Sequence, residues 1–343
     1  MKALLLSSYR HLELAELPVP ALAPDEVLVR IAACGICGSD VHGYDGSSGR
    51  RIPPIVMGHE AAGTISAIGS AITGFDVGDR VTFDSTIFCG KCAYCLRGQT
   101  NLCDHRQVFG VSCGDYRRNG AFAEYLVVPQ RILYHLPENL SFQEAAMLEA
   151  VSVALHAVSL SAIRPGDSAL VMGAGMIGLL ALQALRAAGC AAVYVTDLDP
   201  IRLKLAQQLG ATATLPAAKE ALIPAILERT QGSGVDVVVE AVGQGATVAS
   251  AVGCTRKGGT VTLVGNIAAE VPVPLQKIVT RQIRLQGSCA IAGEYPQAIE
   301  FLANGKITVK SMISAVVPLE EGQQWFDRLY ARDSALMKVL LTP

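Results

Sequence analysis

Residues 168–197, SALVMGAGMIGLLALQALRAAGCAAVYVTD, decide the fold of this 343-residue chain. The apolar run 168–172 predicts a short buried strand, and the glycine-rich GAGMIG at 173–178 predicts a tight turn. An apolar helix is expected over 177–188, followed by a second strand that ends at Asp197. The order strand, glycine turn, helix, strand and acid indicates the first unit of a doubly wound parallel sheet.

The three glycines have separate tasks in such a unit. Gly173 allows the tight turn, Gly175 lets the backbone come close to a pyrophosphate, and Gly178 lets helix and strand pack closely. The helix N-terminus, at Met176 and Ile177, then receives the phosphate charge. This stretch therefore predicts a dinucleotide-binding site.

Asp197 sets the expected choice of dinucleotide. Its carboxylate would accept the adenosine ribose hydroxyls and repel a 2′-phosphate, which favours NAD over NADP. Arg202 follows on the predicted helix PIRLKLAQQLG and leaves NADP open.

Strands and helices continue to alternate up to about residue 287. They predict a Rossmann domain over 151–287 with a parallel sheet of about six strands. The further elements are helices near 218–229 and 245–253, strands at 235–243 and 258–265, and a final run at 281–288.

The N-terminal part has a different texture, in which short alternating apolar runs are separated by Gly, Pro and Asp. This pattern predicts a compact β-rich domain with long loops, so the whole chain is of the α/β class. Its expected elements are strands at 26–34, 63–69, 79–83 and 121–129 and a helix at 141–158.

The tail 288–343 is too short for a domain of its own. It has two helix-like segments, at 293–305 and 319–331, and a strand at 337–341. We therefore expect it to return and complete the first domain, which would consist of residues 1–150 and 288–343.

Four cysteines at the spacing C-x2-C-x2-C-x7-C form a lobe at 89–103. Four thiolates so close in sequence can close a tetrahedral shell around zinc, which makes such a site structural. An iron–sulfur cluster and four unrelated cysteines are the alternatives. The ligands would be Cys89, Cys92, Cys95 and Cys103. Five of the six remaining cysteines, all except Cys37, are expected to be small buried hydrophobes: Cys34, Cys113, Cys190, Cys254 and Cys289.

A second group of metal-ligating residue types lies between Cys34 and Gly63. Cys37 and His59 supply the ligands that zinc favours, and Glu60 stands beside the histidine. Ser39 and His42 offer a hydroxyl and an imidazole that could move a proton. Outside the stretch, Glu149 falls among apolar neighbours in the predicted helix at 141–158, where a carboxylate is costly to bury unless a cation receives it.

The composition of the chain indicates which classes of partner it can bind. The formal net charge of −2 is near balance and no basic stripe with interleaved aromatics appears, which argues against nucleic acid and favours small-molecule chemistry. No export signal is visible, so we expect a cytoplasmic protein. The uncharged window 168–185 is as long as a membrane span, but its glycines favour a strand, turn and helix in a buried core, so no membrane partner is expected.

The chain resembles the zinc-dependent medium-chain dehydrogenases over essentially its full length, with the closest likeness to the sorbitol (iditol), polyol and threonine dehydrogenase branch. GICGSDVH, MGHEAAG, the four-cysteine lobe, the GAGMIG unit and Asp197 occur in the order of the family. The resemblance implies a GroES-like catalytic domain with the Rossmann domain inserted, two zinc ions per chain, NAD, an active site in the cleft between domains, and a homotetramer or homodimer.

The resemblance also implies roles for single residues. Cys37 and His59 match the ligands of the catalytic zinc, Glu60 matches the acid that ligates zinc in the polyol branch, and Glu149 matches a carboxylate that binds zinc directly or through water. Ala150 replaces the proline that follows this glutamate in the family. Asp40 is expected to orient the ring of His59. Ser39 and His42 match the proton relay, which takes the hydroxyl proton while hydride passes to the nicotinamide.

The expected activity is oxidation of a secondary alcohol of a sorbitol- or iditol-like polyol to a ketose by NAD. The Arg-Tyr pair that precedes Tyr-Pro in sorbitol enzymes is missing before Tyr295 and Pro296, which puts sorbitol itself in doubt. Arg50 and Arg51 leave a polyol phosphate such as galactitol 1-phosphate open through guanidinium–phosphate pairing. Oxidation of L-threonine and a non-enzymatic NAD-binding role are the remaining alternatives.

Overall fold

The computed structural model describes residues 1–217 and 221–343, and its contacts divide the chain into two units. The first unit comprises Met1–Glu149, Ile291–Asn304 and Val309–Pro343, and the second comprises Ala150–Ala290 and Gly305–Thr308. The short segment Gly305–Thr308, which the sequence assigned to the tail, packs with the second unit.

The first unit is built on a mixed sheet in the order β12-β6-β5-β3-β20-β19, with β11 also paired to β3. These strands are β3 (Glu26–Gly35), β5 (Glu60–Ile68), β6 (Arg80–Phe83), β11 (Tyr125–Pro129), β12 (Leu133–His135), β19 (Ile313–Pro318) and β20 (Lys338–Thr342). A smaller sheet joins β1 (Lys2–Ser8), β2 (His11–Glu16) and β4 (Ile55–Val56). Two short antiparallel pairs are β7 (Thr86–Ile87) with β8 (Gln107–Val108) and β9 (Val111–Ser112) with β10 (Arg117–Arg118).

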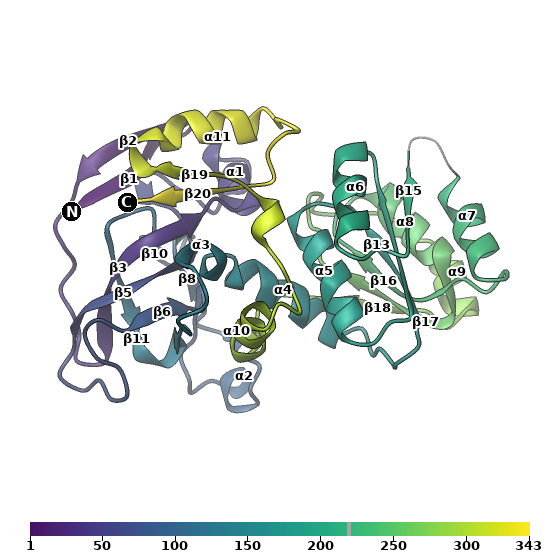
Figure 1. Ribbon diagram of the computed structural model, residues 1–343, viewed down its shortest axis with the longest axis horizontal. Helices are drawn as coiled ribbons and strands as arrows, with labels where there is room; N and C mark the ends of the chain where they lie inside the picture. Colours follow the sequence, from purple (N-terminus) through teal and green to yellow (C-terminus); the bar gives the residue numbers. More distant parts are fainter. Residues whose placement is uncertain (218–220) are drawn as a thin grey trace. The chain divides into compact units, whose positions relative to one another are not determined.

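The C-terminal tail supplies two strands of the large sheet. The predicted strand at 337–341 is β20, which pairs antiparallel with β3 through Leu340 opposite Gly35 and Leu341 opposite Cys34. The strand β19 was not expected; it lies parallel to β20 at the edge of the sheet. The two predicted helices of the tail are α10 (Tyr295–Ala303) and α11 (Gly322–Tyr330). The helix α11 packs against α1 and β2 (Figure 1).

The other helices of the first unit are short. They are α1 (Gly38–Tyr44), α2 (Ala93–Leu96), α3 (Phe142–Ala145) and α4 (Leu148–Ser159), which runs on into the second unit. The single helix predicted at 141–158 is therefore wrong, because it is broken after α3. A capping box between Ser141 and Glu144 starts α3, and α4 begins separately at Leu148. Glu149 consequently lies in the first turn of α4 and not in the middle of a long helix.

The second unit is a parallel sheet in the order β15-β14-β13-β16-β17-β18, six strands in the part of the chain described, as predicted. Figure 1 shows α5 and α6 on one face and α7, α8 and α9 on the other. The strands are β13 (Ser168–Met172), β14 (Ala192–Asp197), β15 (Ala213–Pro216), β16 (Val235–Glu240), β17 (Thr255–Leu263) and β18 (Arg284–Gly287). The helices are α5 (Met176–Ala187), α6 (Pro200–Gln208), α7 (Leu222–Arg229), α8 (Gly245–Cys254) and α9 (Leu275–Thr280).

The predicted helix near 218–229 corresponds to α7, but residues 218–220 lie outside the described part. The window 168–185 divides into β13 and α5 as predicted, and none of the described helices combines the length and apolar character needed to cross a membrane. Cys34, Cys190 and Cys254 are buried as expected, whereas Cys113 is partly exposed and Cys289 is exposed.

Candidate metal centres and cofactor site

Pairing of β3 with β5 brings the first candidate metal ligands together. Glu60 begins β5 and lies opposite Gly35, the last residue of β3, so Cys37 and His59 meet just beyond the end of the ladder. One ligand atom each from Cys37, His59 and Glu60 lies within 4.8 Å of the others. Ligand atoms on a tetrahedral zinc are about 3.3–3.8 Å apart. A small movement of these three side chains toward one another would therefore give three ligands of the right chemistry. The group fits zinc.

Asp40 connects two of these residues. Its Oδ2 accepts a hydrogen bond from the backbone N–H of Cys37 at 3.2 Å, and its Oδ1 lies 3.4 Å from Nδ1 of His59. This arrangement leaves Nε2 of His59 as the metal-facing nitrogen. Burial would raise the pKa of Asp40, but His59 and Arg51 outweigh burial and hold that pKa well below its ordinary value.

Glu60 has a cationic partner that the sequence did not suggest. Lys338, at the start of β20, donates to Oε2 of Glu60 at 2.5 Å and to the carbonyl of Ile36 at 3.1 Å, and both charged side chains are buried. Burial would lower the pKa of Lys338, but Glu60 outweighs it and raises that pKa. Gly35 is required here, because a Cβ at this position would collide with the Glu60 carboxylate. The sequence offered one signal for such a buried ion pair, namely a lysine at the start of the apolar strand KVLLT.

Glu149 lies apart from the three-residue group. Within the described residues its carboxylate is not among the ligand atoms that converge with Cys37, His59 and Glu60, and it instead accepts a hydrogen bond from Ser85 at 3.1 Å. Burial raises the pKa of the Glu149 carboxyl, and the charge of His59 opposes this shift. Glu149 is therefore not one of the converging ligands, and its carboxylate is instead held by Ser85.

Ser39 and His42 lie three residues apart on α1, so they are neighbours on one face of that helix. The Ser39 hydroxyl oxygen is 3.5 Å from Nε2 of His59 and accepts a hydrogen bond from Nη2 of Arg51 at 3.1 Å. His42 is exposed. The helix thus leads from the candidate metal centre to water.

Arg50 and Arg51 have different environments. Arg50 is exposed, whereas Arg51 is 4% exposed and its guanidinium is already bonded to Asp40 and Ser39. Only one arginine of the pair is therefore available to an external phosphate.

The second candidate metal centre is the lobe at 89–103. The sulfur atoms of Cys89, Cys92, Cys95 and Cys103 lie within 4.8 Å of one another, and those of Cys89 and Cys95 are 4.0 Å apart. Tetrahedral zinc thiolate sites have sulfurs about 3.8 Å apart. The backbone N–H of Lys91 lowers the pKa of Cys89 to about 6, while burial and the neighbouring cysteines raise the pKa of Cys95 to about 12. Four thiolates can therefore coexist here only around a cation, which these residues fit.

The glycine turn in the second unit has the geometry of a phosphate cradle. Gly173 has φ +93°, a conformation that favours glycine, and a Cβ on Gly178 would collide with the carbonyl of Gly173. Around Gly175 a Cβ would meet nothing within 4 Å, so the space beside the N-terminus of α5 is open. Met176 and Ile177 form the first turn of α5, where backbone N–H groups are free to bind an anion.

Asp197 lies at the same edge of the sheet. Met172, at the end of β13, is in register with Thr196, which precedes Asp197. The Asp197 carboxylate accepts the backbone N–H groups of Ala174 at 2.6 Å and Asp199 at 2.9 Å, which fixes it beside the glycine turn. Arg202 lies on α6, 3.7 Å from Asp199.

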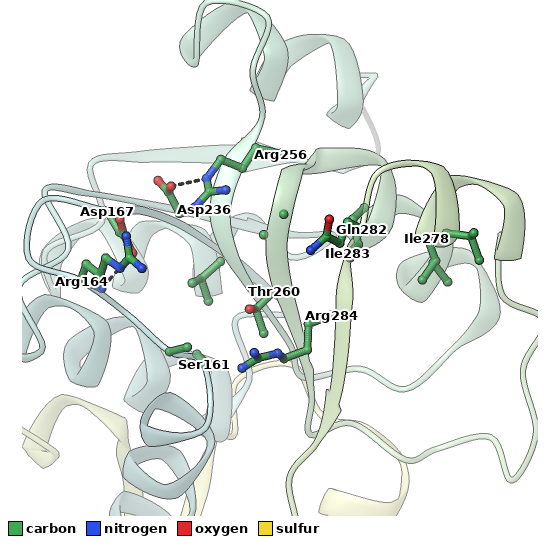
Figure 2. Close-up of a pocket in the computed structure, with 15 residues that line it drawn as sticks. Ser161, Arg164, Asp167, Asp236, Arg256, Thr260, Ile278, Gln282, Ile283 and Arg284 are labelled. Atoms are coloured by element: carbon green, nitrogen blue, oxygen red, sulfur yellow. Dashed lines mark hydrogen bonds and ion pairs between the residues drawn. The ribbon is translucent and has the colours of Figure 1, made fainter.

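A separate cavity of about 770 Å³ opens at the opposite edge of this sheet. It lies at the starts of the strands, where Figure 2 shows Asp236 paired with Arg256 and the side chain of Arg284 directed toward Ser161. Dinucleotides bind outside the carboxyl ends of parallel strands. This cavity is therefore not the cofactor site.

Two family models match this chain, one in its N-terminal part and one in its C-terminal part. Residues 23–138 match the family model for the alcohol dehydrogenase GroES-like domain, and residues 177–304 match the model for zinc-binding dehydrogenase. Sorbitol dehydrogenase of Bacillus subtilis (strain 168) is 36% identical over 347 aligned positions, which cover 100% of this chain and 97% of the relative. The chain belongs to the zinc-dependent medium-chain dehydrogenases.

Other similar proteins place this medium-chain dehydrogenase in the polyol branch. D-xylulose reductase A of Aspergillus niger is 36% identical over 335 positions, covering 95% of this chain and 92% of the relative. The solved structure of galactitol-1-phosphate dehydrogenase from Escherichia coli is 29% identical, with a TM-score of 0.92 and coverage of 100% of both chains. A zinc-binding dehydrogenase structure from Sinorhizobium meliloti 1021 bound to NADP is 32% identical, with a TM-score of 0.89 and coverage of 100% and 99%.

The medium-chain dehydrogenase is thus an oxidoreductase whose cofactors are zinc and a nicotinamide dinucleotide. Membership of this enzyme family also sets aside a purely non-enzymatic NAD-binding role.

Proposed function

We propose that this medium-chain dehydrogenase oxidises a secondary alcohol of a polyol to a ketose, with NAD as the hydride acceptor. The observation that carries the proposal is the convergence of Cys37, His59 and Glu60 beside the Ser39 hydroxyl, in a chain similar to sorbitol dehydrogenase and D-xylulose reductase. We also propose that the protein is cytoplasmic and forms a homo-oligomer.

Each group of site residues has its own role in the proposed reaction. Cys37, His59 and Glu60 would hold a catalytic zinc ion, and Glu149 would bind it through water, as the family resemblance implies. When bound, zinc lowers the pKa of a nearby alcohol and the nicotinamide accepts a hydride from carbon. The Ser39 hydroxyl would accept the alcohol proton, and His42, exposed one turn further along α1, would release a proton to solvent. The second zinc ion would be held by the lobe at 89–103 and support structure only.

The dinucleotide preference depends on Asp197. We expect Asp197→Ser to lower the ratio of kcat/KM with NAD to kcat/KM with NADP by at least about tenfold, equivalent to ~1.4 kcal/mol, because serine keeps an acceptor but removes the charge that repels a 2′-phosphate. Arg202 would then be available to the phosphate. Steady-state kinetics with both dinucleotides measures the ratio. The control is Asp199→Asn, and an unchanged ratio in Asp197→Ser would contradict the assignment.

Two other substrates have specific support. Similarity to galactitol-1-phosphate dehydrogenase favours a polyol phosphate, but only Arg50 of the predicted arginine pair is free to bind the phosphate. The likeness of the sequence motifs to threonine dehydrogenases keeps L-threonine as the other candidate.

A substrate panel tests the proposed function. NADH formation is measured with D-sorbitol, L-iditol, xylitol, galactitol, galactitol 1-phosphate, L-threonine and 2,3-butanediol, each with NAD and NADP. We expect the highest kcat/KM with an unphosphorylated polyol and NAD. Turnover confined to galactitol 1-phosphate or to L-threonine would transfer the proposal to that substrate, and no turnover by fully zinc-loaded protein would overturn it.

A further inference from the structure

Arg51 is a charged side chain with a buried position and a fixed set of partners. Its Nη2 donates to Oδ1 of Asp40 at 3.0 Å and to the Ser39 hydroxyl at 3.1 Å, and its Nε lies 3.3 Å from the same Oδ1. We propose that Arg51 is a positioning residue, which holds the Asp40 carboxylate in place against Cys37 and His59 and orients the Ser39 hydroxyl. The inference rests on the proposed function, since it assumes that His59 binds the catalytic metal and that Ser39 moves the proton.

The local fold is built around this arginine. Its aliphatic stem passes directly over Gly43 of α1, where a Cβ would collide with Cγ of Arg51. Its third nitrogen, Nη1, donates to the carbonyl of Arg50 at 3.3 Å. A surface arginine would have freedom to choose rotamers, whereas this one is held along its whole length. The packed stem and the bonded nitrogens together direct the guanidinium toward Asp40 and Ser39.

Charge explains why Asp40 needs this partner. Asp40 is completely buried, and a buried carboxylate without a cation is costly or becomes protonated. Once a metal occupies Nε2 of His59, the imidazole is neutral and donates only an ordinary N–H to Asp40. Among the contacts of Asp40 in the described part of the chain, Arg51 then provides the remaining positive charge. Because Asp40 contacts both Cys37 and His59, its orientation affects two candidate ligands at once.

The number of hydrogen bonds that a serine hydroxyl can make explains how Arg51 orients Ser39. A serine hydroxyl has one proton to donate and two lone pairs to accept with, and a guanidinium can only donate. Nη2 of Arg51 thus occupies one lone pair of the Ser39 oxygen, and the hydroxyl proton must point to another acceptor. The second lone pair remains for the proton of the substrate. Arg51 in this way sets the direction of the relay without touching substrate.

The test compares zinc retention and kinetics in three variants: Arg51→Lys, Arg51→Gln and the double change Arg51→Gln/Asp40→Asn. Arg328→Gln is the matched control, because Arg328 pairs with Asp333 at 2.9 Å in the first unit, where both side chains are partly exposed. Zinc release to a chelator is followed over time, with the zinc of the cysteine lobe as the internal reference. Melting temperature and the pH profile of kcat are measured on the same preparations.

We expect Arg51→Gln to release the zinc of the Cys37 centre about 10–100-fold faster, the range seen when a group supporting a ligand is lost. The lobe zinc and Arg328→Gln should behave as wild type. The value of kcat should fall and its pH profile should shift, with KM for NAD unchanged, and Arg51→Lys should recover part of the loss. Wild-type zinc release, kcat and pH profile in folded Arg51→Gln would overturn the inference.

The double variant covers the case in which Arg51→Gln does not fold. It removes both buried charges together, so we expect it to fold with rapid zinc release and low kcat. Wild-type zinc release and kcat in this variant would show that Arg51 only balances the charge of Asp40, and would overturn the positioning role. Zinc release needs no substrate, so altered release in a protein that oxidises no polyol would refute the proposed function and leave the metal-positioning part of the inference standing.

Discussion

Loss of polyol-dependent NADH formation, by about 10³-fold or more, is the result we expect for Cys37→Ser and for His59→Ala. Metal activation of a hydroxyl is worth several kcal/mol, and each 1.36 kcal/mol corresponds to a tenfold change in rate. Cys37 and His59 supply two of the three converging ligand atoms, so either change leaves too few to hold zinc. The zinc content should fall by one per chain.

The remaining properties of these two variants separate a lost metal from a lost fold. NAD binding should survive, because the glycine turn and Asp197 belong to the second unit. Cys190→Ser is a suitable control, since Cys190 is a buried thiol of the second unit outside both cysteine-containing groups. Elemental analysis, NAD titration and steady-state kinetics make the measurement. Normal turnover by a metal-depleted Cys37→Ser protein would rule out the assigned role.

The second large effect concerns stability. We expect Cys95→Ser to remove the zinc of the lobe and to lower the melting temperature by on the order of 10 °C, because the binding free energy of a structural zinc ion contributes directly to folding. Apolar packing contributes little around Cys95, since α2 contains no buried residue in the described structure. At low temperature, the folded fraction should retain turnover, because the Cys37 centre is intact.

The control for the lobe is Cys113→Ser, which changes a partly exposed cysteine that lies outside the four-sulfur cluster. Its zinc content and melting temperature should match those of the wild-type protein. Calorimetry and elemental analysis on both variants decide the question. One zinc fewer in Cys95→Ser with unchanged thermal stability would show that the lobe is not a structural site.

Much of the fold could be predicted because its signals are local in sequence. The unit from β13 to Asp197 requires particular glycines at fixed spacing, and the structure confirms the strand, turn, helix and strand there. The four lobe cysteines are so near in sequence that any compact loop brings their sulfurs together. Convergence of Cys37 with His59 was also predictable, but from the family pattern and not from spacing, because it depends on the pairing of β3 with β5.

The parts that escaped prediction depend on contacts between distant segments. Lys338 meets Glu60 only because β20 pairs with β3, and nothing near Lys338 in the sequence indicates that partner. The sequence left Arg51 open to phosphate binding, whereas its packing over Gly43 buries it. The break between α3 and α4 changed the position of Glu149 for a similar reason, since the apolar pattern runs through it without interruption.

Stepwise removal of zinc tests the central claim most directly. A chelator is added to the wild-type protein, and zinc per chain and polyol-dependent NADH formation are measured on the same samples as metal is lost. If the Cys37 centre is catalytic and the lobe structural, one class of zinc will account for all of the activity, which will disappear with it at unchanged fold and return when zinc is restored. Polyol oxidation that continues after the Cys37 centre has lost its zinc would contradict the account.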